Sequence, residues 1–206
     1  MKSQVTTKKG DAGQTTALDG EAFAKDHPLM EALGALDTMR AQIALLRTQV
    51  QEQRPDAARE AEFLLFILHA CFLFGSALAD ARNRKPEWHP LRLESLHLDL
   101  LEAEQARLEA GLQLPRAFIA CASNSIAAQA DIAAGYVRAF ERRLVAFQRI
   151  VPEFSDPVYG AFANRLSDFL FILARHLEAG RHQPVDYTIV QPGYLSQSAG
   201  DGTGTA

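Results

Sequence analysis

The stretch PLMEALGALDTMRAQIALLRTQV, residues 28 to 50, decides the fold class, because its apolar residues recur at helical rather than strand spacing. Proline is favoured in the first turn of a helix, so Pro28 marks the start. We therefore predict an amphipathic helix from residue 28 to about residue 50. The apolar residues that set its period are Leu29, Leu33, Leu36, Ile43 and Leu46.

Four further helices are expected downstream. The first of them is apolar on nearly all sides in its middle, which is typical of a helix enclosed by others. Pro86 and Pro90 break the chain before the next one, and Gly180 closes the last. Strand-like alternation is confined to residues 187–190. The expected helices cover about residues 56–81, 93–111, 125–150 and 157–179.

Five helices with short connections predict an all-α, up-and-down bundle with a glycine-rich N-terminal arm. A chain of 206 residues with 48% hydrophobic residues is long enough for one buried core. We expect a single domain over residues 1–182, in which residues 1–27 form the arm. Residues 183–206 are expected to be a C-terminal tail that ends in a disordered, polar segment.

Composition argues against several classes of protein. The net charge of -4 provides no basic field, so nucleic-acid binding is not expected. The most apolar run, 63–79, is interrupted by polar residues, and the N-terminal lysines precede no apolar run, so neither a membrane span nor a secretion signal is expected. Cys71 and Cys121 lack C-x-x-C spacing and are expected to be small buried residues of a cytoplasmic protein.

The segment TKKGDAGQTTALDG, residues 7 to 20, looks least like packing material. Gly10 and Gly13 permit backbone conformations in which successive amides point at an anion, while the lysines and threonines add charge and hydroxyl donors. It is not a Walker A loop, because G-x-x-x-x-G-K-[ST] is missing. On chemistry alone, a phosphate site and a flexible arm both remain open.

Polar residues on the last two expected helices are the other candidates. One helical face carries Arg138, Glu141 and Arg142. These residues could form a clamp for phosphate or a solvated stripe of ion pairs. Asn164 opens the segment NRLSDFLFILAR, as a helix-end feature or a ligand contact. The histidines show no H-x-x-x-H spacing, so no metal held by protein side chains is expected.

Five segments, in this order, resemble the PduO-type corrinoid adenosyltransferases, trimeric helical bundles that move the adenosyl group of ATP to cobalt. The resemblance covers about residues 5 to 180 and implies a homotrimer with ATP at the contact between subunits. The segments are TKKGDAGQTTAL (7–18), KDHPLMEALGALD (25–37), LEAEQARLEAGLQLPRAFI (101–119), RAFERRLVAF (138–147) and NRLSDFLFILAR (164–175).

The resemblance implies a nucleotide side that is nearly intact and that binds ATP together with Mg²⁺. Fixed cations and backbone amides there would stabilise charge on the departing triphosphate. Arg138 and Glu141 would act in catalysis together with Phe118. The ATP-binding residues would be Thr7, Lys8, Lys9, Gly10, Asp11, Gly13, Thr15, Thr16, Lys25, Arg138, Glu141, Arg142 and Asn164.

On the corrinoid side, Phe118 matches a phenylalanine that the family places next to the cobalt of cobalamin. By taking the place of the lower axial ligand, such a ring makes the Co(I) state easier to reach. The alternative is a core aromatic residue just after Pro115. Asp37 matches an aspartate that the family pairs with an arginine of the neighbouring subunit.

The departures from the family pattern lie on this corrinoid side. Where the family has F-[IV]-L-P-G-G, this chain has FIACASN at 118–124, so a loop that needs glycine would take another path. Ala134 replaces the first arginine of the fourth helix, which leaves Asp37 without its expected partner. Arg40, three residues along the same helix, could compensate locally.

Two functions follow from this pattern. The first is transfer of the adenosyl group of ATP to cob(I)alamin, with a reductase and an adenosylcobalamin-dependent enzyme as implied partners. The second is a paralogue that binds ATP, cobalamin or both without efficient transfer, as a sensor, carrier or regulatory partner.

Overall fold

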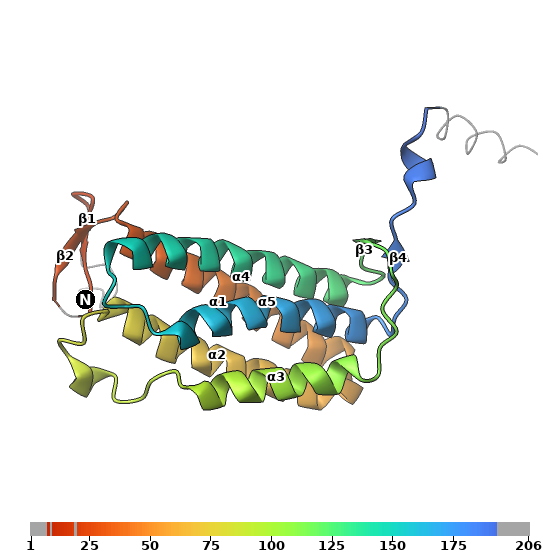
Figure 1. Ribbon diagram of the computed structural model, residues 1–206, viewed down its shortest axis with the longest axis horizontal. Helices are drawn as coiled ribbons and strands as arrows, with labels where there is room; N and C mark the ends of the chain where they lie inside the picture. Colours follow the sequence, from red (N-terminus) through yellow and green to blue (C-terminus); the bar gives the residue numbers. More distant parts are fainter. Residues whose placement is uncertain (1–7, 9, 19, 193–206) are drawn as a thin grey trace, which may run out of the picture.

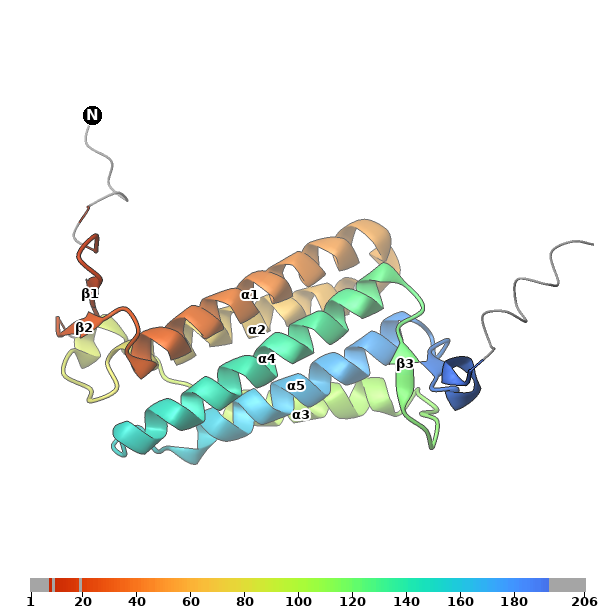
Figure 2. The same ribbon diagram turned by 90° about the horizontal axis from the view of Figure 1, so that it is seen from above.

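The computed structural model describes residues 8, 10–18 and 20–192. Within them, five α-helices run alternately up and down and form one bundle, which confirms the expected fold class (Figures 1 and 2). Helix α4 packs between α1 and α5, α2 packs on α1, and α3 packs on α5. The helices are α1 (Pro28–Gln53), α2 (Ala58–Ala79), α3 (Ser95–Glu109), α4 (Ser125–Ile150) and α5 (Pro157–Leu177).

Local side-chain chemistry sets most of the helix ends. His27 caps α1, Asn124 caps α4 and Asp156 caps α5, each by accepting a hydrogen bond from a backbone N–H of the first turn. Gly180, with φ +71°, closes the end of α5 as expected. The bounds therefore agree with the sequence prediction to within a few residues.

The most enclosed helix is α5, not the second helix as the sequence suggested. α5 lies between α3 and α4 and is buried on most of its faces. α2 leaves Phe72 60% exposed, because it packs mainly against α1. By length and composition alone, Pro55–Ala79 is apolar enough to cross a membrane, with a mean hydropathy of 1.9, and 44% of its most apolar window is buried in the bundle.

Two small antiparallel sheets lie at opposite ends of the bundle, and neither was predicted (Figure 1). β1 (Gln14–Thr16) pairs with β2 (Ala22–Ala24) at the end where α1 begins. At the far end, β3 (Ile119–Cys121) pairs with β4 (Gln183–Pro184). Strands of two or three residues are too short to show a period in the sequence.

The strand-like alternation at Tyr187–Val190 does not form a strand, because these residues form a 3-10 helix. The Asp186 side chain accepts hydrogen bonds from the backbone N–H and the hydroxyl of Thr188, which favours a turn. β4 lies inside the expected tail of 183–206, so the start of that tail belongs to the fold. Residues 193–206, including its final polar segment, lie outside the described residues. The two other 3-10 turns are Pro55–Ala57 and Pro86–Trp88.

The loop between α2 and α3 is organised by one buried carboxylate, Asp80. Its oxygens accept hydrogen bonds from the backbone N–H groups of Arg84 and Lys85 and bond to Nε2 of His89, each at 2.7 Å. Burial opposes ionisation of Asp80, but these three hydrogen bonds together hold its pKa below the ordinary value. The loop is therefore fastened to the end of α2.

We expect Asp80→Asn to lower the free energy of unfolding by about 3 kcal/mol at pH 7, because it breaks a buried, charged hydrogen-bond network. A depressed folded-state pKa stabilises above the unfolded pKa, and that contribution is lost as the pH falls through the folded pKa. Urea unfolding of wild type and Asp80→Asn should be measured from pH 7 to pH 3. The difference in their free energies of unfolding should stay constant down to about pH 4 and become smaller below it. A difference that does not change with pH would contradict this assignment.

Candidate functional site

The described residues of the arm fold into a turn followed by the β1–β2 hairpin. The N–H of Gly13 donates to the carbonyl of Gly10 at 3.2 Å, and the N–H of Lys25 donates to the carbonyl of Gly13 at 2.9 Å. Gly13 has φ +78°, a conformation that favours glycine. The hairpin thus brings together Gly10, Asp11, Gly13, Thr15, Thr16 and Lys25 of the expected nucleotide side.

Lys25 lies directly against the turn. A Cβ atom added to Gly10 would lie 3.2 Å from both Cε and Nζ of Lys25. The absence of a side chain at residue 10 therefore leaves room for the Lys25 ammonium group. Lys8 is exposed and has φ +59°. The arm therefore gathers cationic side chains beside a backbone turn, as an anion site requires. Thr7 and Lys9 of the predicted set lie outside the described residues.

The arm is fastened to the end of the bundle where α1 begins and α4 ends. The ring of Phe23 packs on His27, with ring centroids 4.7 Å apart, and faces a small cavity of 160 Å³ that Phe147 also lines. Glu21 forms ion pairs with Arg82 at 3.2 Å and Arg84 at 3.0 Å. These contacts fix the position of the hairpin.

On α4, the predicted clamp is present but not held together as expected. Arg138 and Arg142 are exposed and Glu141 is half-buried. Among the residues the structure describes, no ion pair joins Glu141 to either arginine. Ion pairs on an exposed helix surface contribute little free energy, so helical spacing alone does not keep Glu141 paired with either arginine. The two guanidinium groups therefore face solvent, where they can meet an anion.

Asn164 lies on the same face of the bundle as these residues. Arg175 of α5 pairs with Asp131 of α4 at 2.7 Å, which fixes the register of the two antiparallel helices. Asn164 and Arg142 each lie eleven residues from that pair, about 16 Å along their helices. They therefore lie at the same level of one surface, which we call the α4/α5 face. It carries Asp131, Arg138, Glu141, Arg142, Asn164, Asp168, Phe171 and Arg175.

Phe118 is 80% exposed, so the alternative of a core aromatic residue is wrong. It borders a cavity of 380 Å³, the Phe118 cavity, at the far end of the α4/α5 face. Arg175 lines this cavity although it is only 1% exposed. Burial raises the pKa of Asp131, against the opposing charge of Arg175. The other lining residues are Leu114, Pro115, Ala117, Ile119, Ala120, Cys121 and Phe171.

The segment after Phe118 has no need of the family's glycines. Residues 119–121 form β3, and no residue from 118 to 124, all of which the structure describes, has a positive φ. Cys121 is exposed and its thiol donates to Oε1 of Gln183 at 3.6 Å, so its expected burial is wrong. Cys71 is buried as expected, and burial raises its pKa to about 12.

Asp37 keeps an ion pair through the local partner that the sequence offered. Arg40 Nη2 lies 2.9 Å from Asp37 Oδ1, and both residues belong to α1. The guanidinium of Arg40 also lies 4.2 Å from the ring centroid of Phe72. The local ion pair that the sequence allowed is therefore present.

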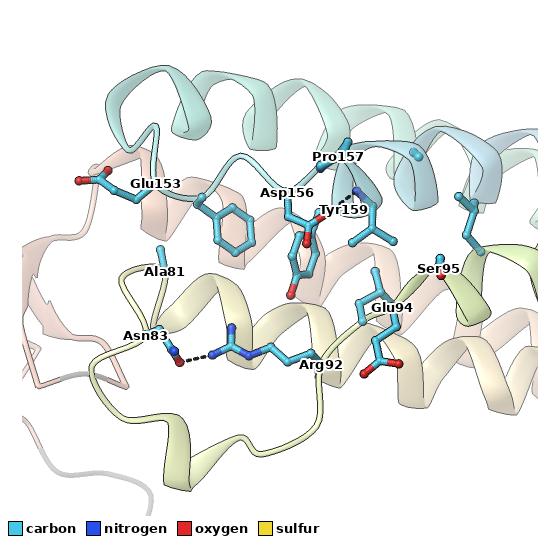
Figure 3. Close-up of a pocket in the computed structure, with 14 residues that line it drawn as sticks. Ala81, Asn83, Arg92, Glu94, Ser95, Glu153, Asp156, Pro157 and Tyr159 are labelled. Atoms are coloured by element: carbon cyan, nitrogen blue, oxygen red, sulfur yellow. Dashed lines mark hydrogen bonds between the residues drawn. The ribbon is translucent and has the colours of Figure 1, made fainter.

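A larger cavity, of 850 Å³, contains none of the predicted site residues (Figure 3). It lies between the α2–α3 loop and the α4–α5 turn, where Arg92 bonds to Asn83. Burial raises the pKa of Tyr159, although a hydrogen bond from Arg92 opposes the shift.

Comparison with known proteins identifies the family of this chain. The family model described as cobalamin adenosyltransferase matches residues 5–177, which include most of the arm, Phe118 and the whole α4/α5 face. The chain belongs to the cobalamin adenosyltransferase family.

Individual relatives of this family cover most of the chain. The corrinoid adenosyltransferase PduO of Salmonella typhimurium is 30% identical over 192 residues, 93% of this chain, and the chain spans 55% of that relative's length. A cobalamin adenosyltransferase of Cupriavidus metallidurans is 33% identical over 85% of this chain and 88% of its own. A variant PduO-type ATP:corrinoid adenosyltransferase of Lactobacillus reuteri, complexed with cobalamin and ATP, shares the fold: TM-score 0.77, 21% identity, covering 88% of this chain and 95% of its own.

Sequence reasoning missed Asp131 and Arg175, which join the two helices of the site. The signal was present, because a charged residue inside the apolar run DFLFILAR is costly to bury without a partner. The partner itself lies 44 residues away, so only the fold identifies it.

Proposed function

We propose that the protein transfers the 5′-deoxyadenosyl group of ATP to the cobalt of cob(I)alamin, giving adenosylcobalamin and triphosphate. The observation that carries the proposal is the α4/α5 face, which places exposed arginines and an exposed phenylalanine beside a cavity on one surface. Arg138 lies seven residues, about 10 Å, along α4 from Asp131 at the Phe118 cavity. Membership of the family and the names of its relatives support the same reaction.

In this reaction the electron pair of Co(I) attacks C5′ of the ribose. A cobalt–carbon bond forms, the bond from C5′ to the triphosphate oxygen breaks, and cobalt becomes formally Co(III). The protein's task is to place the carbon and to stabilise charge on the leaving triphosphate. We assign that stabilisation to Arg138, Arg142 and the cationic arm, and the positioning of the nucleotide to Glu141 and Asn164.

Mg²⁺ is expected to accompany ATP and to neutralise part of the phosphate charge. Across the described part of the chain, no three His, Cys, Asp or Glu side chains gather as a metal site. We therefore propose that the ion is held chiefly by the phosphates. Phe118 would lie against the corrinoid, where an apolar ring takes the place of the lower axial ligand.

We propose that the site is completed between subunits of a homotrimer. Among the described residues, no hydrogen bond or ion pair joins the arm to Arg138, Arg142 or Asn164, and the arm docks on the side of α1 instead (Figure 2). An arm from a second copy would supply the missing cations to the α4/α5 face. Light scattering should give a mass about three times the 22.6 kDa of the chain, and a monomer would contradict this arrangement.

One assay tests the reaction. Purified protein with Mg-ATP and chemically reduced cobalamin should form a light-sensitive product with the adenosylcobalamin spectrum. Protein without ATP, and ATP without protein, are the controls. An unchanged spectrum together with measurable ATP binding would reject transfer and leave a binding paralogue.

We expect Gly10→Ala to weaken ATP binding several-fold, about 1 kcal/mol, without lowering stability, because the new methyl group displaces the Lys25 ammonium. Isothermal titration with ATP measures the affinity. Gly34→Ala is the matched control, since a Cβ there meets nothing within 4 Å. An unchanged affinity in Gly10→Ala would remove Lys25 from the phosphate site.

The product and the electron supply imply two further partners, a reductase and an adenosylcobalamin-dependent enzyme. We place this chemistry in the cytoplasm, which the two free cysteines support. The net charge of -4 gives no reason to propose nucleic acid as a partner.

A further inference from the structure

Behind the Phe118 cavity lies a second buried carboxylate, Glu178, which has no solvent exposure. It stands just beyond residue 177, where the match to the family model ends. Its Oε2 accepts a hydrogen bond from the backbone N–H of Ser123 at 2.7 Å, between β3 and α4. This short charged bond ties the rewritten loop to the end of α5.

The other oxygen of Glu178 faces a guanidinium group and an imidazole ring. Its Oε1 lies 2.8 Å from Nε of Arg175, as an ion contact without hydrogen-bond geometry, and 3.6 Å from Nδ1 of His182. Arg175 in turn pairs with Asp131 at the cavity wall and lies 5.2 Å from the ring centroid of Phe171. Glu178 therefore fixes the charged wall of the cavity as well as its loop.

Phe118, which directly precedes β3, is also held by the segment after Glu178. The N–H of Val185 donates to the carbonyl of Phe118 at 2.8 Å, and Ile119 pairs with Pro184. His182, whose side chain is buried, directly precedes β4 and connects that strand to Glu178. One carboxylate thus contacts the loop after β3, the last turn of α5 and the residue before β4.

We propose that Glu178 is a positioning residue: it holds the Phe118 ring in place beside the Phe118 cavity and thereby determines the affinity of the protein for the corrinoid. The proposal rests on the proposed function for the identity of the ligand. It explains how a chain without the family's glycine loop can still hold the phenylalanine in one place. Glu178 itself does not touch substrate.

The test is Glu178→Ala beside Glu178→Gln, with transfer kinetics and corrinoid binding measured separately. In Glu178→Ala we expect KM for cob(I)alamin to rise at least about tenfold, with KM for ATP within about twofold of wild type. Glu178→Gln keeps an oxygen for the Ser123 N–H and should recover part of the loss. Equilibrium binding of cob(II)alamin should be weaker in Glu178→Gln than in wild type, and weakest in Glu178→Ala.

Asp80→Asn is the matched control, because it also removes the charge of a buried carboxylate that accepts backbone N–H groups, at the opposite end of the bundle. It should lower stability yet leave corrinoid affinity unchanged. If Glu178→Ala lowers stability but leaves both KM and binding of the corrinoid at wild-type values, the positioning role is wrong. If wild type binds cobalamin without transferring to it, and binding still depends on Glu178, the positioning role stands and the proposed reaction fails.

Hydrogen–deuterium exchange supplies a readout that needs no ligand. Peptides covering residues 118–123 should exchange faster in Glu178→Ala than in wild type, while peptides covering the α2–α3 loop should not. Unchanged exchange at residues 118–123 would overturn the proposal, whatever the activity.

Discussion

Arg138→Ala lowers kcat for adenosyl transfer by about a hundredfold to a thousandfold, which is the loss expected when one fixed donor to a developing anion is removed. Arg138 is exposed on the α4/α5 face, without an ion pair to Glu141, so its guanidinium is free to bind phosphate oxygens. Its removal should leave the helix intact, because the residue is exposed. The far-ultraviolet circular dichroism should therefore match wild type.

Two variants sharpen this experiment. Arg138→Lys keeps the charge but loses the paired N–H donors, so it should recover only part of kcat. Arg149→Ala removes another exposed arginine of α4 and should leave kcat unchanged. Wild-type turnover in Arg138→Ala would remove this residue from the reaction.

Phe118→Ala slows transfer from cob(II)alamin with a mild reductant at least about tenfold more than transfer from cob(I)alamin reduced beforehand. The reason lies in the proposed function, in which the 80% exposed ring beside the cavity would exclude a lower axial ligand that otherwise stabilises the oxidised cobalt. A change of about 60 mV in the Co(II)/Co(I) potential alters the Co(I) fraction about tenfold. The measurement is the rate of transfer from cob(II)alamin divided by the rate from cob(I)alamin, determined for wild type and for Phe118→Ala.

Phe118→Leu should retain most of the wild-type ratio, because it keeps an apolar side chain in the same place. Leu91→Ala, an exposed apolar position on the α2–α3 loop, serves as the control and should change neither rate. If Phe118→Ala slows both reactions equally, the ring contributes to binding or packing and has no part in the reduction step.

The geometry of the arm follows more directly from local sequence than the geometry of the Phe118 cavity does. The turn at Gly10 and Gly13, the threonines and Lys25 lie within 16 residues, so local spacing already brings them together. The corrinoid side depends on Phe118, Asp131 and Arg175, which are far apart in the chain. Their proximity comes from the packing of α4 against α5.

Periodicity and end signals by themselves determined the five helices and nearly all of their bounds, because both are local properties. Five motifs in the family's order indicated the family, because recognising them needs no knowledge of contacts, and the match of the family model to residues 5–177 shows it. Local patterns failed for the second helix, whose apolar composition predicted enclosure that only its neighbours decide. They failed too for the four short strands, which are too brief to carry a period.

Only the tertiary structure decided how the chain manages without the family's glycine loop. The bond from Ser123 to Glu178 spans 55 residues, and the pairing of β3 with β4 joins segments that are still further apart in the chain. The sequence alone specified which residues replace the loop. That a buried carboxylate and a late strand hold Phe118 in place follows from three-dimensional contacts, which no local pattern encodes.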